Sequence, residues 1–221
     1  MHLRMTAERL IGLLLGLFAT LFAAVRTNRT AAFDLAVTLK LQERRTPALD
    51  RLMRAVSWPG FPPQSRIIPP AVMATWWFAG RRRAATFLLL AWSGAAISTV
   101  IKAAIRRPRP LPPQVRVVVA PLGGTSFPSG HVLTYVGFYG FLGFLLSEHL
   151  DGAWRGASLA GTAAVLGLVG PSRIEQGHHW ATDVLASYLL GLAYLLVLVQ
   201  LYHTTTRRGL LEASLRQVVD R

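Results

Sequence analysis

Long apolar runs constrain this chain more than any other feature of its sequence. The runs His131 to Leu150, Ala153 to Gly170 and Asp183 to Tyr202 each come close to the roughly 20 residues that a helix needs to cross a bilayer. Such runs are longer than the core elements of a soluble protein. The sequence therefore predicts an all-α, polytopic integral membrane protein.

Three more apolar runs raise the predicted number of transmembrane helices to six: Leu10 to Val25, Ile67 to Gly80 and Ala84 to Ile105. The first ends in Phe-Ala-Ala, which is also compatible with a cleaved secretory signal. We expect a retained helix, because five further runs follow it. The second is short and carries Pro69 and Pro70 near its start, so we expect it to tilt or to extend into the preceding loop.

A basic connection, residues 26–66, separates the first two runs. Thr46 is a candidate N-cap with Pro47 at the first helical position. The apolar residues that follow repeat at the spacing of one helix face: Leu49, Leu52, Met53 and Val56. This pattern predicts an amphipathic helix lying on the bilayer surface.

The excess of positive charge limits the possible partners. Lys and Arg number 24 against 10 acidic residues, a net charge of +14, and no nucleic-acid-binding motif accompanies them. In a membrane protein such an excess favours anionic lipid headgroups and phosphate over nucleic acid. The pattern makes no prediction of an oligomeric state.

Three polar clusters are separated by these runs. They read Lys102, six residues, Arg109-Pro110; Pro128-Ser129-Gly130-His131; and Ser172-Arg173, five residues, His179, three residues, Asp183. The loops after the first, third and fifth crossings must share one face of the membrane, so the clusters are expected to form a composite site there. The short Arg81 to Arg83 loop and the basic termini place the other face in the cytoplasm. The basic connection argues the opposite way, and we give more weight to the short loop.

The residue types suit phosphoryl transfer. Lys102, Arg109 and Arg173 are cations for the charge that spreads over phosphate oxygens in the transition state. Ser129 and the backbone N–H of Gly130 would add donors at a helix N-terminus, where phosphate binding is favoured.

The two histidines complete the predicted chemistry. His179 and Asp183 are four residues apart, so the carboxylate can hold one ring nitrogen and leave the other free to attack phosphorus. His131 would protonate the departing oxygen and then activate water. His178 competes with His179 for the role of nucleophile, but only His179 has Asp183 at the helical spacing.

The three clusters together resemble the signature of the type 2 phosphatidic acid phosphatase superfamily, with no departure at the defining positions. The resemblance covers about residues 84–202, which we interpret as the catalytic core of a single membrane domain, residues 1–221. It implies the same roles for the same residues and a bacterial inner-membrane enzyme, and the distribution of basic residues predicts that the site faces outward. The implied substrates are undecaprenyl diphosphate, which the basic connection slightly favours, phosphatidylglycerol phosphate and phosphatidic acid.

Other interpretations remain open. The phosphohistidine could be transferred to an acceptor lipid, which would make the protein a phosphotransferase, or the same cations could serve an anion-binding or transport protein. No metal and no cofactor is expected, because three cations in one pocket repel a divalent ion. We expect Arg106, Arg107 and Arg116, which lie near the clusters, to be solvated charges.

Overall fold

The computed structural model describes residues 2–43, 46–118 and 123–219, with side chains described for residues 6–206 of these ranges. Its helices are α1 (His2–Arg26), α2 (Ala31–Glu43), α3 (Pro47–Ser57), α4 (Gln64–Phe78), α5 (Arg82–Trp92), α6 (Gly94–Ala104), α7 (Gly130–Thr134), α8 (Gly140–His149), α9 (Gly152–Glu175) and α10 (Ala181–Val219). A 3₁₀ turn (Trp58–Gly60) follows α3, and a π-helical turn (Tyr135–Tyr139) joins α7 to α8. The described residues contain no strand, which confirms the predicted all-α class.

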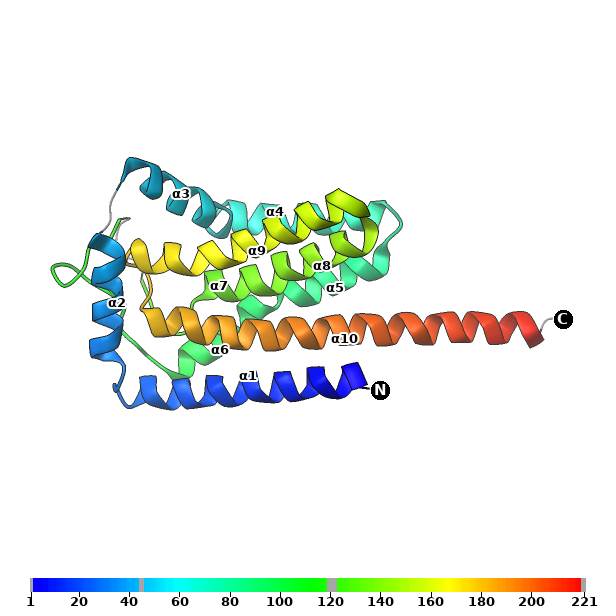
Figure 1. Ribbon diagram of the computed structural model, residues 1–221, viewed down its shortest axis with the longest axis horizontal. Coiled ribbons are helices and arrows are strands. Elements are labelled where there is room, and N and C mark those ends of the chain that lie inside the picture. Colours follow the sequence, from blue (N-terminus) through cyan, green and yellow to red (C-terminus); the bar gives the residue numbers. More distant parts are fainter. Residues whose placement is uncertain (1, 44–45, 119–122, 220–221) are drawn as a thin grey trace.

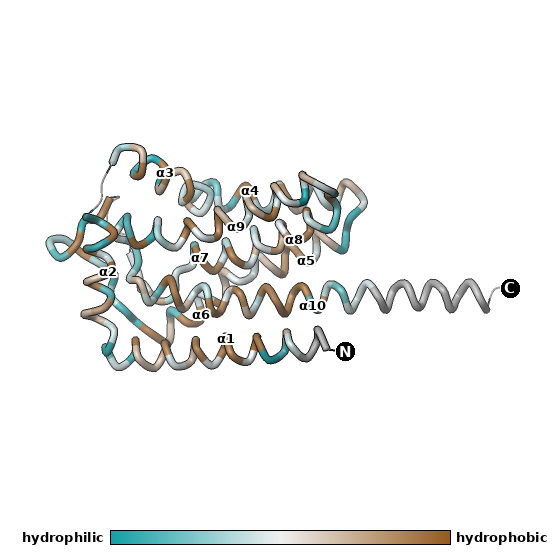
Figure 2. The backbone as a smooth tube through the Cα atoms, viewed as in Figure 1, coloured by the Kyte–Doolittle hydropathy of each residue, from teal (hydrophilic) through white to brown (hydrophobic). Residues whose placement is uncertain are grey.

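Among the residues that the structure describes, five helical stretches are long and apolar enough to cross a membrane. They are Thr6–Arg26, Arg82–Ala104, Gly130–His149, Gly152–Glu175 and Ala181–Thr206, and they contain 20 to 26 residues each. Their outward surfaces carry exposed large apolar side chains such as Leu13, Leu17 and Leu201, as lipid-facing surfaces do. Figure 2 shows apolar residues along most of the coloured part of α1 and of α10. The chain is therefore an integral membrane protein. The 15-residue helix α4 is shorter than these spans, so a sixth crossing stays a prediction.

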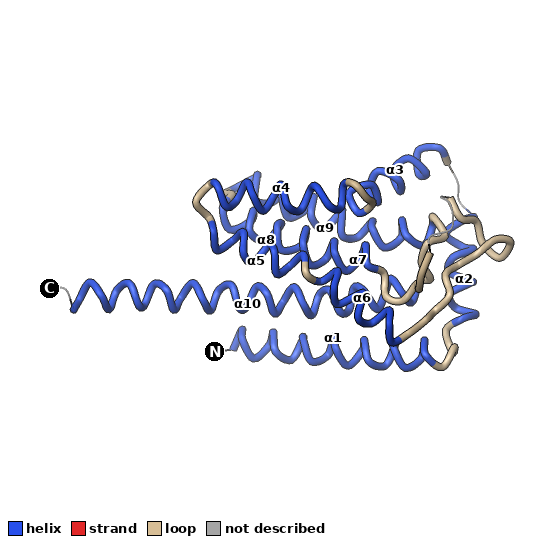
Figure 3. Tube along the Cα trace, turned by 180° about the vertical axis from the view of Figure 1, so that it is seen from behind, coloured by secondary structure: helices blue, strands red, loops and turns tan. Residues whose placement is uncertain are grey.

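The long helices run roughly parallel, and α2 lies across one end of the bundle (Figure 1). At this same end α1 and α6 terminate and α10 begins, and the loop between α6 and α7 folds over it (Figure 3). The buried core between the helices is built from apolar side chains, among them Leu88, Phe138, Phe141 and Leu145. The packing places the three polar clusters at one end of the molecule, as the order of the apolar runs predicts.

In the described part of the basic connection, helix α2 precedes the one helix that the sequence predicts. The expected helix is α3, whose N-cap Thr46 accepts a hydrogen bond from the backbone N–H of Leu49 at 3.1 Å. The unpredicted helix is α2, which buries Asp34 and Thr38 while Phe33 and Leu39 are exposed. The most buried positions of α2 are polar and the apolar residues around them, such as Val37 and Leu41, are only partly buried, so hydrophobic periodicity gives no signal for this helix.

Three predicted boundaries are corrected. The run Ala84 to Ile105 is two helices, because α5 ends at Trp92, where the following Ser93 hydroxyl donates to the Leu90 carbonyl. Helix α9 continues through Pro171 to Glu175, so Arg173 lies in its last turn rather than in a loop. Helix α10 continues to Val219, beyond the end of the predicted run at Tyr202.

Candidate active site

All eight residues singled out in the sequence lie at the end of the bundle that α2 crosses. Lys102 is in the last turn of α6, and Arg109 is in the loop after it. Ser129 directly precedes α7, and Gly130 and His131 are its first residues. Arg173 is in the last turn of α9, His179 lies in the turn that follows, and Asp183 is in the first turn of α10. Four helix termini, the ends of α6 and α9 and the starts of α7 and α10, therefore assemble the site, because each cluster lies at the boundary of an apolar run.

The ring of His179 is held with one nitrogen free to react. Its Nδ1 lies 2.8 Å from the carbonyl oxygen of Ser126. A carbonyl only accepts, so Nδ1 carries the hydrogen and Nε2 keeps its lone pair. Asp183 Oδ2 lies 3.6 Å from Nδ1, within ion-pair range but beyond hydrogen-bond distance. Asp183 was predicted to hold this nitrogen; in the structure the Ser126 carbonyl accepts its hydrogen and sets the tautomer, with the Asp183 carboxylate beside it.

One cation lies beside the free nitrogen, and two others act on the ring electrostatically. One terminal nitrogen of Arg109 lies 3.3 Å from His179 Nε2 and also donates to the His178 carbonyl at 2.7 Å. Lys102 Nζ donates to the Thr125 carbonyl at 2.9 Å, in the loop that leads to α7. Burial, with added repulsion from Arg109, Arg173 and Lys102, lowers the pKa of His179 well below its ordinary value. The lowered pKa favours the neutral ring, the form that a nucleophile needs.

Arg173 is completely buried and fixes His178 as a donor. Its guanidinium donates to His178 Nδ1 at 2.5 Å and lies over the ring of Phe61, 4.8 Å from the ring centroid. Since Nδ1 accepts, the hydrogen of the neutral ring is on Nε2. Burial and the charges of Arg173 and Arg109 lower the pKa of His178 to about 3, so this arrangement persists at neutral pH. The sequence reasoning considered His178 only as a rival nucleophile and missed this role.

Several buried polar atoms in the site have no hydrogen-bond partner among the described residues: Ser129 Oγ, His131 Nε2, Arg173 Nε and His178 Nε2. Unpaired buried polar groups are costly and rare. Three of them, in Ser129, Arg173 and His178, are hydrogen-bond donors, which matches the oxygen-rich surface of a phosphate. The backbone N–H of Ser129, by contrast, is taken by the Ser187 hydroxyl at 2.8 Å. The serine hydroxyl is thus the group of Ser129 that remains to bind an anion.

A turn from the basic connection holds His131 in place. The Phe61 ring contacts His131 edge-to-face at 4.8 Å between centroids and contacts His178 at 6.0 Å. Gly60 lies so close that a Cβ there would overlap the His131 imidazole. The Tyr135 hydroxyl donates to the Val56 carbonyl at 2.7 Å, which ties this turn to the helix that carries His131.

We therefore expect Gly60→Ala to displace the His131 ring and to lower kcat by about 100-fold, since a displacement of about 1 Å in a catalytic group has an effect of this size. Gly156→Ala in α9 is the matched control, because nothing lies within 4 Å of a Cβ at that position. Steady-state kinetics of the two purified variants measure the effect. A folded Gly60→Ala protein with wild-type kcat would show that the contact with Gly60 is not needed.

A cavity of about 300 Å³ adjoins His131 on the membrane side of the site. It is lined by residues of α4, α5, α6, α7 and the two short turns, among them Gly60, Pro69, Trp92, Thr99, Lys102, His131 and Tyr135. Its walls are mainly apolar, and its charged or titratable lining includes Arg66, Lys102 and His131. The arrangement suits a molecule with an anionic head and an apolar remainder.

Two arginines expected to be solvated are ion-paired instead. Arg107 contacts Asp183 Oδ1 and Asp34 Oδ2, each at 2.5 Å. Arg116 pairs with Glu175 at the end of α9, and its backbone N–H donates to the Gln42 side chain of α2 at 3.0 Å. All three acids come from segments remote in sequence from their arginine, so no local pattern signals these ion pairs.

Comparison with known proteins agrees with this arrangement. Residues 83–207 match the PAP2 superfamily. Phosphatidylglycerophosphatase B of Bacillus subtilis (strain 168) is 31% identical over 185 residues, covering 79% of this chain and 86% of the relative.

Solved structures show the same fold. The transmembrane PAP2-type phosphatidylglycerolphosphate phosphatase from Bacillus subtilis superposes with a TM-score of 0.78 at 25% identity, over 88% of this chain and 96% of that one. LpxE from Aquifex aeolicus superposes with a TM-score of 0.62 at 22% identity, over 76% of this chain and 95% of that one. The chain therefore belongs to the PAP2 superfamily and is a membrane lipid phosphatase.

Proposed function

We propose that this protein removes phosphate from phosphatidylglycerol phosphate through a phosphohistidine formed on His179. The observation that carries the mechanism is the fixed tautomer of His179, whose Nδ1 donates to the Ser126 carbonyl at 2.8 Å while Nε2 faces Arg109. The lipid is chosen because phosphatidylglycerophosphatase B, the relative at 31% identity, carries this substrate in its name. Undecaprenyl diphosphate and phosphatidic acid are the other candidates.

The first step forms a bond between His179 Nε2 and phosphorus and breaks the bond from phosphorus to the lipid oxygen. Arg109, Arg173 and Lys102 stabilise the charge on the phosphoryl oxygens, with Ser129 and His178 donating further hydrogen bonds. Protonated His131 gives its proton to the departing lipid oxygen. The resulting imidazolium is stabilised by the Asp183 carboxylate.

The second step releases phosphate. Neutral His131 accepts a proton from water, the water oxygen attacks phosphorus, and the bond to His179 Nε2 breaks, which regenerates the free ring. Because the lipid oxygen lies against His131 in the first step, the cavity beside His131 is the place for the glycerol and the start of the tail.

We further propose that residues 1–221 form a single membrane domain whose catalytic core is residues 84–202. In this arrangement α4 makes a sixth crossing together with its flanking residues, and α3 lies at headgroup level, where Arg51 and Arg54 are exposed to anionic lipids. The Arg81 to Arg83 loop is cytoplasmic. The site then faces the outer side of a bacterial inner membrane, and substrate arrives laterally.

Phosphate release from detergent-purified protein tests the proposal. We expect release from phosphatidylglycerol phosphate in excess chelator, because the chemistry above uses only side chains of this chain. Undecaprenyl diphosphate and phosphatidic acid, measured in parallel, rank the substrates. Activity that is lost in chelator and restored by a divalent ion would contradict the mechanism, and phosphate found on a second lipid in place of free phosphate would indicate a phosphotransferase.

A further inference from the structure

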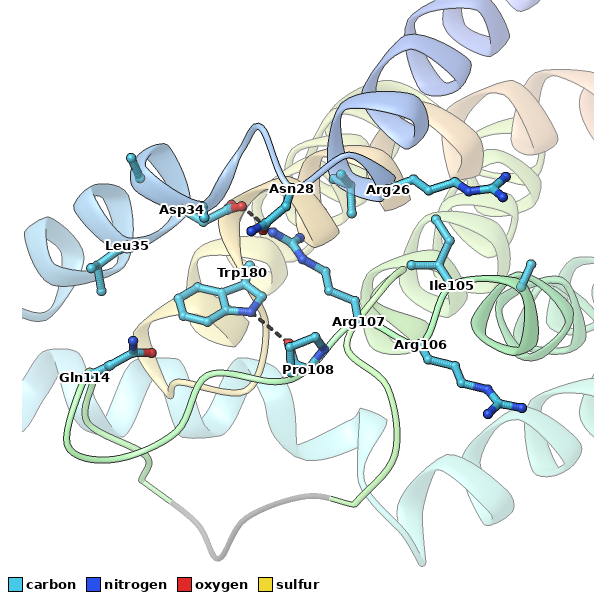
Figure 4. Close-up of a pocket in the computed structure, with 14 residues that line it drawn as sticks. Arg26, Asn28, Asp34, Leu35, Ile105, Arg106, Arg107, Pro108, Gln114 and Trp180 are labelled. Atoms are coloured by element: carbon cyan, nitrogen blue, oxygen red, sulfur yellow. Dashed lines mark hydrogen bonds and ion pairs between the residues drawn. The ribbon is translucent and has the colours of Figure 1, made fainter.

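Asp34, in the inner face of α2, is a buried carboxylate with no place in the mechanism above. It is 1% exposed, and Arg107 joins it to Asp183, which is completely buried. Arg107 itself has a side chain that is 10% exposed, at the wall of a cavity of about 670 Å³ between the ends of α1, α2 and α6. Figure 4 shows Asp34 and the Arg107 guanidinium turned toward each other across this wall.

Arg107 is the centre of a hydrogen-bonded cluster, the Arg107 cluster, whose other members are Asp34, Asp183, Thr30 and Thr182. One terminal nitrogen donates to Asp183 Oδ1 at 2.5 Å and to the Thr182 hydroxyl at 2.8 Å. The other donates to Asp34 Oδ2 at 2.5 Å and to the Thr30 hydroxyl at 3.1 Å. A planar guanidinium can bridge two carboxylates in this way, whereas an ammonium group lacks the fork.

Asp34 also binds the N-terminus of α10 directly. Its Oδ1 accepts from the backbone N–H of Thr182 at 2.8 Å, and its Oδ2 accepts from the Thr182 hydroxyl at 2.9 Å. The first N–H groups of a helix have no partner within the helix, and a carboxylate there also interacts favourably with the helix dipole. Asp34 therefore anchors the turn that carries both His179 and Asp183.

The Arg107 cluster fixes which carboxylate oxygen of Asp183 lies next to the His179 ring. With Oδ1 held by Arg107, Oδ2 accepts from the backbone N–H of Trp180 at 2.9 Å and lies 3.6 Å from His179 Nδ1. The charges matter as well as the geometry. Two carboxylates share one guanidinium, so the cluster keeps a net negative charge next to the ring that becomes positive when Nε2 attacks phosphorus.

We propose that Asp34 is a positioning residue of the phosphatase, acting through Arg107 on Asp183; this inference rests on the proposed roles of His179 and Asp183. Without the Asp34 charge, Arg107 neutralises Asp183 completely, and the developing imidazolium loses part of its stabilisation. Asp34 lies outside residues 83–207, which match the superfamily. The N-terminal segment thus adds a component to the site that the three sequence clusters do not contain.

The test is Asp34→Asn, which preserves shape and one acceptor while removing the charge. With phosphatidylglycerol phosphate as the substrate, we expect kcat to fall by about 10- to 100-fold. This is the range found for residues that hydrogen-bond to a metal ligand and orient it. KM should change less than about twofold. Glu43→Gln is the matched control, since Glu43 lies on the same helix in an exposed pair with Lys40 and should leave kcat unchanged. Asp34→Glu, which keeps the charge, should recover part of the lost kcat.

A purely structural role gives a different result. In that case the midpoint temperature of thermal unfolding falls in Asp34→Asn, but the activity per folded molecule stays at the wild-type value. This result would overturn the proposal. Arg107→Lys keeps the positive charge in case Asp34→Asn does not fold, and it should lower kcat with KM retained because one ammonium cannot bridge both carboxylates. A folded Arg107→Lys protein with wild-type kcat would also overturn it. Wild-type protein that releases no phosphate from any lipid phosphate would instead contradict the proposed function.

Discussion

Replacing His179 with alanine is expected to lower kcat by at least about 10⁴-fold, because loss of a covalent nucleophile removes the reaction path itself rather than one stabilising contact. The folded protein should persist, since the ring is held by one hydrogen bond to the Ser126 carbonyl and one long contact with Asp183. Phosphate release from phosphatidylglycerol phosphate measures the loss. Acid-quenched reactions with labelled substrate should trap a phosphorylated protein in the wild type and none in the variant.

His178→Ala is the matched control for this result. His178 is the neighbouring histidine and is equally buried, but its Nδ1 accepts from Arg173 and its Nε2 carries a hydrogen. Its removal takes away one donor, so we expect a smaller loss of kcat and a phosphorylated protein that still forms. The reverse pattern, with trapping lost in His178→Ala and kept in His179→Ala, would reassign the nucleophile.

Replacing His131 with alanine is expected to lower kcat for lipid substrates by about 10²- to 10⁴-fold, the usual contribution of a general acid and base. The loss should depend on the leaving group. A nitrophenyl phosphate ester releases a stable anion that needs no proton, so phosphorylation of His179 should be spared while hydrolysis of the intermediate stays slow. Rapid-mixing kinetics should show a burst of nitrophenolate close to one equivalent of enzyme.

The burst of nitrophenolate distinguishes a general acid and base at His131 from a residue that only binds substrate. If His131 only held the substrate, the variant would show a raised KM for both kinds of ester and no burst. Thr134→Ser, one turn along the same helix, is a suitable control because Thr134 lines the same cavity without a titratable group. If Thr134→Ser gives the same nitrophenolate kinetics as the wild type, the burst seen in His131→Ala is due to the loss of the imidazole.

The N-terminal third of the chain contributes more to the site than its sequence indicates. Gly60 and Phe61 pack against His131, and Phe61 also lies beneath the Arg173 guanidinium. Asp34 reaches Asp183 through Arg107. Each contact joins a segment outside residues 83–207 to a residue of the three clusters. Sequence variation in this segment is therefore expected to alter catalysis and substrate fit while the clusters stay the same.

The sequence by itself determined the membrane class, the all-α fold, five of the spans and the residues that gather at one end of the bundle. These features follow from the lengths of the apolar runs and from their order, both of which are local or topological properties of the chain. The N-cap at Thr46 was predictable for the same reason, since the cap and the helix that it starts are adjacent in sequence.

Only the tertiary structure decided how the gathered side chains are held. The tautomer of His179 depends on a carbonyl 53 positions away, at Ser126, and the orientation of Asp183 depends on Asp34, which enters through Arg107. Helix α2 was not predicted because its buried residues, Asp34 and Thr38, are polar. The part of α2 that contacts the site therefore shows no hydrophobic periodicity. Contacts between segments remote in sequence leave no periodic pattern, because each partner is chosen by the packed fold and not by its neighbours in the chain.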